Sequence, residues 1–220
     1  MVLNIICLHG FTQNSQIFKK KLSKLVKSTK NINLVFMDGP VILPNSDSTE
    51  SERSMRSTCD LATRSDSRAY WTYNLEDLLN IELIDTKPET KLYHLENSLE
   101  AFLELANHLR KVDGIIGFSQ GGCFADYICK LHANGKIPFD LKFAIFVASK
   151  SFDSSDFANK PTIKTLHMYG ESDTIIPNDL SKLLCESYDN KIVYVHKGAH
   201  IVPSTSSAKI AFKNFVSQFE

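Results

Sequence analysis

The sequence predicts a single α/β domain over residues 1–220, with a mostly parallel central sheet and helices on both faces. Short runs rich in Val, Ile and Phe alternate with segments of helical periodicity, a pattern typical of parallel sheets with crossover helices. With 220 residues and 43% hydrophobic content, the chain can bury the core of one medium-sized domain. Polar residues follow the apolar runs, where ligands bind in such sheets.

Apolar runs bounded by turn residues are the predicted strands, and helically spaced apolar residues mark the predicted helices. The runs cover residues 2–10, 32–40, 112–119, 143–149, 164–170 and 191–198. Their nearly continuous apolar character indicates strands that are covered on both faces. Apolar residues recur at intervals of three and four in the predicted helices, which are 92–109, 124–131, 177–188 and 206–219.

One polar stretch interrupts this alternation, and we expect an insertion or lid at about residues 45–75. It is dense in Ser, Asp, Glu and Arg, and a polar segment of this length inside a compact domain is commonly a functional loop. A surface insertion without a role is the alternative. Trp71 and Tyr73 follow the polar part. They either line a substrate pocket or pack the insertion onto the domain.

Composition and charge narrow the classes of partner. The 25 basic and 25 acidic residues balance, and the isoelectric point is about 7.0, so no overall field favours nucleic acid or an anionic membrane. The N-terminal apolar run is too short for a signal peptide, and no stretch predicts a membrane span. Five scattered cysteines without CxxC spacing argue against a disulfide framework or a metal site. We expect a soluble cytoplasmic protein, with nuclear localisation and oligomeric state left open.

The motif GFSQGG contains the candidate nucleophile. Residues 117–121 form the pattern G-x-S-x-G between a predicted strand and a predicted helix, the context in which a serine hydroxyl projects from a strained turn. Glycines at the flanking positions let the neighbouring backbone approach closely. Ser119 is therefore the predicted nucleophile, and the N–H of Gln120 at the helix start is a predicted oxyanion donor.

A serine nucleophile requires a base and an acid that orients it, in the chain order Ser, acid, His. His200 follows the last predicted strand, whereas His167 and His196 lie inside predicted strands. Asp173 lies just beyond the strand 164–170, and Glu171 is its main competitor. We predict His200 as base and Asp173 as the orienting acid.

The loop after the first predicted strand offers the second oxyanion donor. In this architecture such an early loop commonly supplies a backbone N–H. The sequence LHGFTQN favours the N–H of Phe11, with Thr12 as the alternative. His9 precedes the loop, so we expect it to form local hydrogen bonds that shape the loop.

Taken together, these segments resemble the FSH family of serine hydrolases, the α/β-hydrolase group that includes the ovarian-cancer-associated gene 2 proteins. The resemblance rests on LHGFTQN, RAYW, GFSQGG, GESDTIIP and GAHIVP, and it spans nearly the whole chain. It implies the α/β-hydrolase fold, a triad of Ser119, Asp173 and His200, and backbone donors at Phe11 and Gln120. It also implies carboxylesterase-type chemistry on acyl esters, with no cofactor.

The expected activity is hydrolysis of esters of small to medium molecules through an acyl-enzyme, without a metal ion. A thioesterase or acyl-protein deacylase with the same triad is the nearest alternative. A binding protein that kept the fold but lost catalysis is the alternative of another class.

Overall fold

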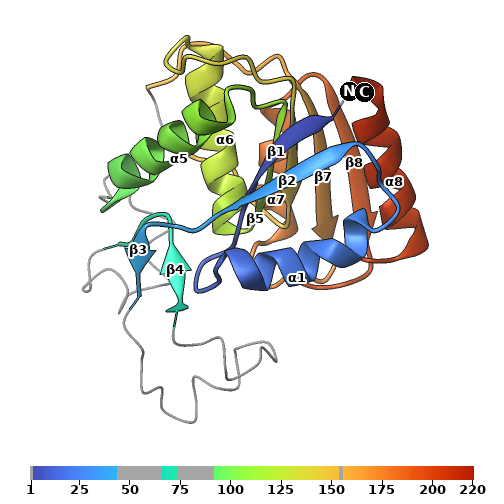
Figure 1. Ribbon diagram of the computed structural model, residues 1–220. Helices are drawn as coiled ribbons and strands as arrows, with labels where there is room; N and C mark the ends of the chain where they lie inside the picture. Colours follow the sequence, from blue (N-terminus) through green and yellow to red (C-terminus); the bar gives the residue numbers. More distant parts are fainter. Residues whose placement is uncertain (1, 44–65, 74–91, 154–155) are drawn as a thin grey trace.

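The computed structural model describes residues 2–43, 66–73, 92–153 and 156–220. One parallel sheet of six strands in the order β2-β1-β5-β6-β7-β8 forms its centre (Figure 1). Every predicted run contains one strand of this sheet, and neighbouring strands pair in parallel throughout. The strands are β1 (Leu3–Leu8), β2 (Ile32–Met37), β5 (Gly114–Phe118), β6 (Phe143–Val147), β7 (Lys164–Gly170) and β8 (Lys191–His196). The predicted parallel sheet is confirmed.

Helices cover both faces of the sheet, and each face has its own apolar core. Helices α1 (Ser15–Val26) and α8 (Ser206–Val216) pack on one face, and α8 continues into a short 3₁₀ turn at Ser217–Phe219 (Figure 1). Helices α5 (Leu95–Leu109), α6 (Gln120–Ala133) and α7 (Asn178–Glu186) pack on the other. This arrangement explains why the strands are apolar throughout, since successive side chains enter opposite cores.

Helix α1 is an element that the sequence analysis does not predict. The side chain of Asn14 caps it by accepting a hydrogen bond from the Ile17 N–H at 2.9 Å. Its buried residues are Ile17, Phe18, Leu22 and Leu25. They make only a narrow apolar stripe between lysines, so few apolar residues mark this helix in the sequence.

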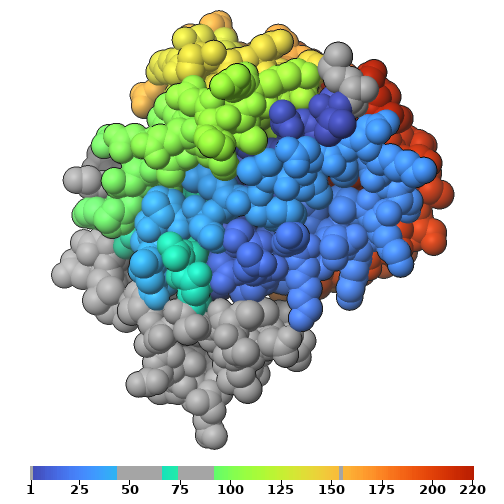
Figure 2. All heavy atoms as spheres, in the orientation of Figure 1, coloured from blue at the N-terminus to red at the C-terminus, as the bar shows by residue number. Residues whose placement is uncertain are grey.

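The predicted insertion at 45–75 lies outside the described residues except for 66–73. Within this segment, β4 (Arg68–Ala69) pairs antiparallel with β3 (Val41–Ile42). In the space-filling view, the turquoise atoms of β4 lie next to the blue atoms of β3 (Figure 2). The Tyr70 hydroxyl donates to the carbonyl of Met37 at 3.1 Å, so residues 66–73 lie against the end of β2. No helix within the described ranges is long and apolar enough to cross a membrane.

Candidate active site

The predicted triad residues and the predicted oxyanion donors all follow strands of the central sheet. Phe11 follows β1, Ser119 follows β5, Asp173 follows β7 and His200 follows β8. Because the strands are parallel, their carboxyl ends meet at one edge of the sheet. The topology thus brings to this edge residues that lie far apart in the sequence.

Ser119 occupies a strained turn between β5 and α6. Its φ of 53° and ψ of −119° lie in a region that side chains rarely adopt. The turn is held from both directions, because the Ser119 N–H donates to the Val147 carbonyl at 3.0 Å while the Ser119 carbonyl accepts from the N–H groups of Gly122 and Cys123. This is the geometry expected when a serine hydroxyl must project beyond a sheet.

Two glycines of the motif are required by close backbone contact. A Cβ atom on Gly121 would lie 2.3 Å from the Leu8 carbonyl oxygen, and one on Gly117 would lie 2.3 Å from the Gly121 oxygen. Both distances are far below van der Waals contact. Helix α6 therefore begins directly against the end of β1, which places the serine turn beside the β1–α1 loop.

Asp173 and His200 form a hydrogen-bonded pair. Asp173 Oδ2 lies 2.8 Å from His200 Nδ1, and the Asp173 side chain is fully buried. Its other oxygen, Oδ1, accepts the N–H groups of Ile175 and Ile176, each at 2.9 Å. These contacts fix the carboxylate, so it can hold the imidazole in one orientation.

Glu171, the competing acid, lies elsewhere. Its carboxylate is half-exposed and 3.6 Å from the Lys197 ammonium. Its backbone N–H donates to the His196 carbonyl at 2.7 Å, which joins the loop after β7 to the end of β8. The geometry therefore pairs His200 with Asp173 rather than with Glu171.

His200 lies next to the serine turn through a ring contact. The centre of its imidazole is 4.9 Å from the centre of the Phe118 ring, which immediately precedes Ser119. Among the described residues, no hydrogen bond joins Ser119 to His200. The structure thus links His200 to Asp173 directly, and to the Ser119 turn through the ring of Phe118.

The peptide between Gly10 and Phe11 is held by its carbonyl. The Gly39 N–H donates to His9 Nε2 at 2.9 Å, so the proton of the neutral ring is on Nδ1, which donates to the Gly10 carbonyl at 2.8 Å. The Gln13 N–H donates to the same carbonyl at 3.1 Å. In a trans peptide the N–H points opposite to the carbonyl, which leaves the Phe11 N–H directed away from these partners.

Gly10 lies close to the serine turn, because a Cβ atom built on it would lie 3.3 Å from Ser119 Cβ. The Gln120 N–H belongs to the first turn of α6, where backbone donors have no partner within the helix. Within the described part of the chain, neither Phe11 nor Gln120 uses its N–H in another hydrogen bond. Both predicted oxyanion donors thus belong to loops that meet at the serine turn.

Residues Tyr70 and Gln120 have side-chain contacts that the sequence analysis misses. The Tyr70 hydroxyl accepts the His9 N–H at 3.0 Å and donates to the Met37 carbonyl at 3.1 Å. The Gln120 carboxamide bonds to the backbone of Tyr70 and Trp71. The family motif RAYW was the available signal in the sequence, but it does not reveal these partners.

The aromatic residues after the polar stretch are largely enclosed. Trp71 is 4% exposed, with ring contacts to Phe124 and Phe152. Tyr73 is partly buried and packs against the same apolar core. Trp71 and Tyr73 thus pack against the domain, and a role in substrate binding stays a prediction.

Burial favours the neutral forms of His9 and His167. It lowers the pKa of His9, a residue whose ring packs on Tyr70 at 4.9 Å. It lowers the pKa of His167 to about 3. His167 Nε2 lies 2.9 Å from the Thr165 hydroxyl, and the His167 ring contacts those of Phe146 and Tyr188.

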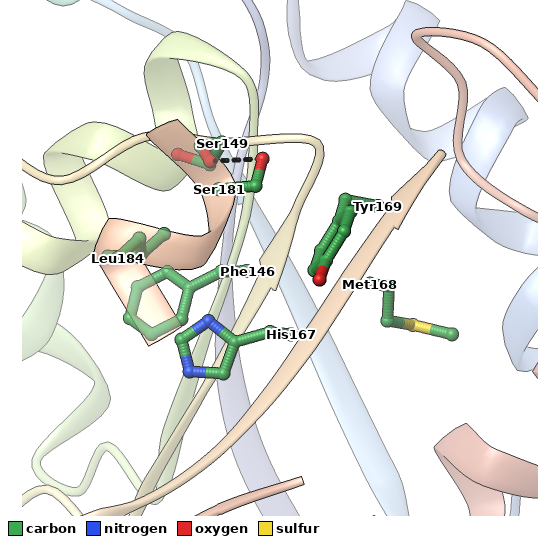
Figure 3. Close-up of a pocket in the computed structure, with 7 residues that line it drawn as sticks. All are labelled: Phe146, Ser149, His167, Met168, Tyr169, Ser181 and Leu184. Carbon is green, nitrogen blue, oxygen red and sulfur yellow. Dashed lines mark hydrogen bonds between the residues drawn. The ribbon is translucent and has the colours of Figure 1, made fainter. Parts of the chain in front are cut away.

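His167 also borders a narrow space between β6, β7 and α7 (Figure 3). Here the Ser181 hydroxyl donates to the Ser149 carbonyl at 3.1 Å (Figure 3). The space is too small to hold a water molecule, so it is a packing gap and not a ligand site. Within the four described ranges, no cluster of His, Cys, Asp and Glu could hold a metal ion.

The parallel sheet and its serine turn define an α/β-hydrolase fold, which comparison with solved structures confirms. Maize acyl-protein thioesterase 2 superposes with a TM-score of 0.65 at 17% identity, covering 99% of this chain and 93% of that one. The Bacillus cereus carboxylesterase superposes with a TM-score of 0.63 at 17% identity, covering 100% and 89%.

Sequence comparison identifies the family. The family model described as Serine hydrolase (FSH1) matches residues 1–212. Esterase OVCA2 of Danio rerio is 31% identical over 228 residues, which cover 99% of this chain and 98% of the relative. The chain belongs to the FSH1 serine hydrolase family, as the sequence motifs indicated.

Proposed function

We propose that this chain is a carboxylesterase that cleaves acyl esters of small to medium molecules through Ser119, His200 and Asp173. The hydrogen bond between Asp173 Oδ2 and His200 Nδ1, at the sheet edge that also carries the strained Ser119 turn, is the observation that supports it most. Membership of a serine hydrolase family and a relative named as an esterase point the same way.

In the proposed reaction, His200 Nε2 removes the hydroxyl proton as Ser119 Oγ attacks the ester carbonyl. The N–H groups of Phe11 and Gln120 stabilise the oxyanion, and one such donor is commonly worth about 10²- to 10³-fold in turnover. His200 then protonates the departing alcohol. Water, deprotonated by His200, releases the carboxylic acid from the acyl-enzyme.

A fluorophosphonate probe tests this assignment, because it phosphonylates an activated serine. We expect the wild-type protein to be labelled on the peptide that contains Ser119, and Ser119→Ala to lose both labelling and hydrolysis of an activated ester. Ser23→Ala, which removes an exposed serine on α1, is the matched control and should retain both. Continued labelling and hydrolysis by Ser119→Ala would disprove the assignment, and a folded wild type that is never labelled would favour a binding protein.

The atom of the leaving group, oxygen or sulfur, distinguishes carboxylesterase activity from thioesterase activity. The maize structural relative is an acyl-protein thioesterase, and the proposed triad would also attack a thioester. Rates on oxygen esters and thioesters with the same acyl chain, from acetyl to palmitoyl, distinguish them. We expect the oxygen esters to be cleaved with the higher kcat/KM. A consistent preference for thioesters would replace the carboxylesterase proposal with thioesterase activity.

A further inference from the structure

Residues 66–73 contact both loops that carry the proposed oxyanion donors. On the β1 side, the Thr12 N–H donates to the Arg68 carbonyl at 3.0 Å, and the Arg68 N–H donates to the Gln13 carbonyl at 2.9 Å. On the α6 side, the contact is made by the side chain of Gln120. This segment therefore joins the two loops next to Ser119.

The Gln120 carboxamide matches the backbone that it meets. Its Oε1 accepts the Tyr70 N–H at 3.0 Å, and its Nε2 donates to the Trp71 carbonyl at 2.9 Å. This contact needs one acceptor and one donor on the same planar group, which an amide has and a carboxylate lacks. The backbone N–H of Gln120 takes no part in it.

Trp71 is one of the two residues whose backbone this contact holds. Its ring centre lies 6.1 Å from that of Phe152 and 6.5 Å from that of Phe124. Its indole Nε1 is buried and has no hydrogen-bond partner within the described residues. The Trp71 carbonyl is bound by the side chain of the residue directly after Ser119, so this tryptophan lies next to the serine turn.

We propose that the Gln120 carboxamide is a positioning residue that holds Trp71 as an apolar wall of the substrate site, and so sets how tightly the apolar portion of the ester binds. The proposal rests on the proposed esterase function. The same residue would then contribute its N–H to the oxyanion and its side chain to substrate binding.

The fluorescence of Trp71 tests the positioning without requiring activity, since the chain has a single tryptophan. Gln120→Met keeps the length of the side chain and the backbone N–H but removes both hydrogen bonds. We expect a red-shifted emission and stronger acrylamide quenching in this variant. Ser119→Ala should match the wild type in both measurements. Unchanged emission and quenching in a folded Gln120→Met would overturn the proposal.

Steady-state kinetics on p-nitrophenyl esters of increasing acyl length test the link to substrate binding. We expect Gln120→Met to raise KM for the longer esters about tenfold, the equivalent of one net hydrogen bond, while kcat for the acetate changes less. Trp71→Phe, which keeps the backbone contacts, should also raise KM for the longer esters. If Trp71→Phe leaves KM unchanged for every ester, the wall assignment is wrong even if Gln120→Met does not fold.

Gln120→Glu adds a pH readout. The new carboxylate can still accept from the Tyr70 N–H, but it faces the Trp71 carbonyl without a proton to donate. When protonated, it can do both. For the longer esters, we expect the ratio of its KM to that of wild type to fall toward one as the pH is lowered from 8 to 5. The same ratio for Gln120→Met should not change with pH. Equal ratios at both pH values would contradict the contact as the cause. The Trp71 emission of Gln120→Glu, measured at the same pH values, tests the contact without requiring activity. The esterase assignment fails separately, if the wild type hydrolyses no ester.

Discussion

The Asp173–His200 side of the candidate site and the Phe11–Gln120 side are held in place by different kinds of contact. Asp173 Oδ1 accepts N–H groups only two and three residues further along the chain. The Phe11–Gln120 side depends on Tyr70, which is 61 residues from His9 and 50 residues from Gln120. Local hydrogen bonds thus hold the Asp173 carboxylate, whereas the loops that carry the proposed oxyanion donors are joined by long-range hydrogen bonds in addition to their local ones.

This difference predicts how each side responds to substitution. Changes at Asp173 should impair catalysis and leave the fold intact, because the surrounding loop contains its own hydrogen bonds. Changes at Tyr70 should affect stability and catalysis together, because its hydroxyl joins β1 to the end of β2. The following predictions test this contrast, beginning with the largest effect.

Asp173→Asn should lower kcat by about 10³- to 10⁴-fold. The amide oxygen would keep the N–H groups of Ile175 and Ile176, which turns the NH₂ group toward His200 Nδ1. The imidazole would then carry its proton on Nε2 and could not accept one from Ser119. Steady-state kinetics and thermal unfolding measure the two effects. Asp179→Asn, at an exposed position on α7, should change neither, and a large loss of stability in Asp173→Asn would contradict the local character of this side.

Tyr70→Phe should destabilise the fold by about 1–3 kcal/mol and lower kcat/KM about tenfold for every ester, because it leaves the buried His9 N–H and Met37 carbonyl without their partner. Urea unfolding and ester hydrolysis measure these changes. Tyr188→Phe is the matched control: this tyrosine is also fully buried, but its hydroxyl donates to Asp126 at 2.6 Å. It should lose stability and keep kcat/KM. If both variants lose kcat/KM equally, the effect of Tyr70 is not specific to the oxyanion side.

His167→Leu should flatten the dependence of stability on pH below pH 6.5. Burial lowers the pKa of His167 to about 3, so between about pH 6.5 and 3 only the unfolded chain binds this proton. The unfolding free energy of wild type therefore falls with decreasing pH, by about 1.4 kcal/mol per pH unit for one proton. Urea unfolding from pH 6.5 to 4.5 should show a smaller slope in the variant. His108→Gln, at an exposed position, should retain the wild-type slope, and an identical slope in His167→Leu would rule out this histidine as the source.

The fold and the main candidate residues could be predicted from the sequence because both depend on local sequence patterns. A continuous apolar run identifies a buried strand, and the glycines around Ser119 identify the turn. Asp173 and His200 are then identified because each follows a later strand and because they come in the chain order Ser, acid, His. Helix α1 was missed because its apolar stripe is narrow.

The side-chain contacts of Tyr70 and Gln120 could not be predicted in the same way. They join residues about 50 positions apart, and no periodicity links one to the other. The role predicted for Gln120 from the sequence involves only its backbone N–H, which every residue except proline has. The requirement for glutamine becomes visible only when the partner atoms are located in space.

The contact between Gly121 and the end of β1 also limits how this site can diverge. Because a Cβ atom at Gly121 would lie within 2.4 Å of the carbonyl oxygens of both Leu8 and His9, neither the serine turn nor the β1–α1 loop can gain bulk without displacing the other. New substrate preferences would therefore arise more easily at Trp71 and Tyr73, because residues 66–73 contact the two loops through backbone atoms and through the Tyr70 hydroxyl. A mutant library for altered specificity should accordingly vary Trp71 and Tyr73 and leave residues 117–122 unchanged.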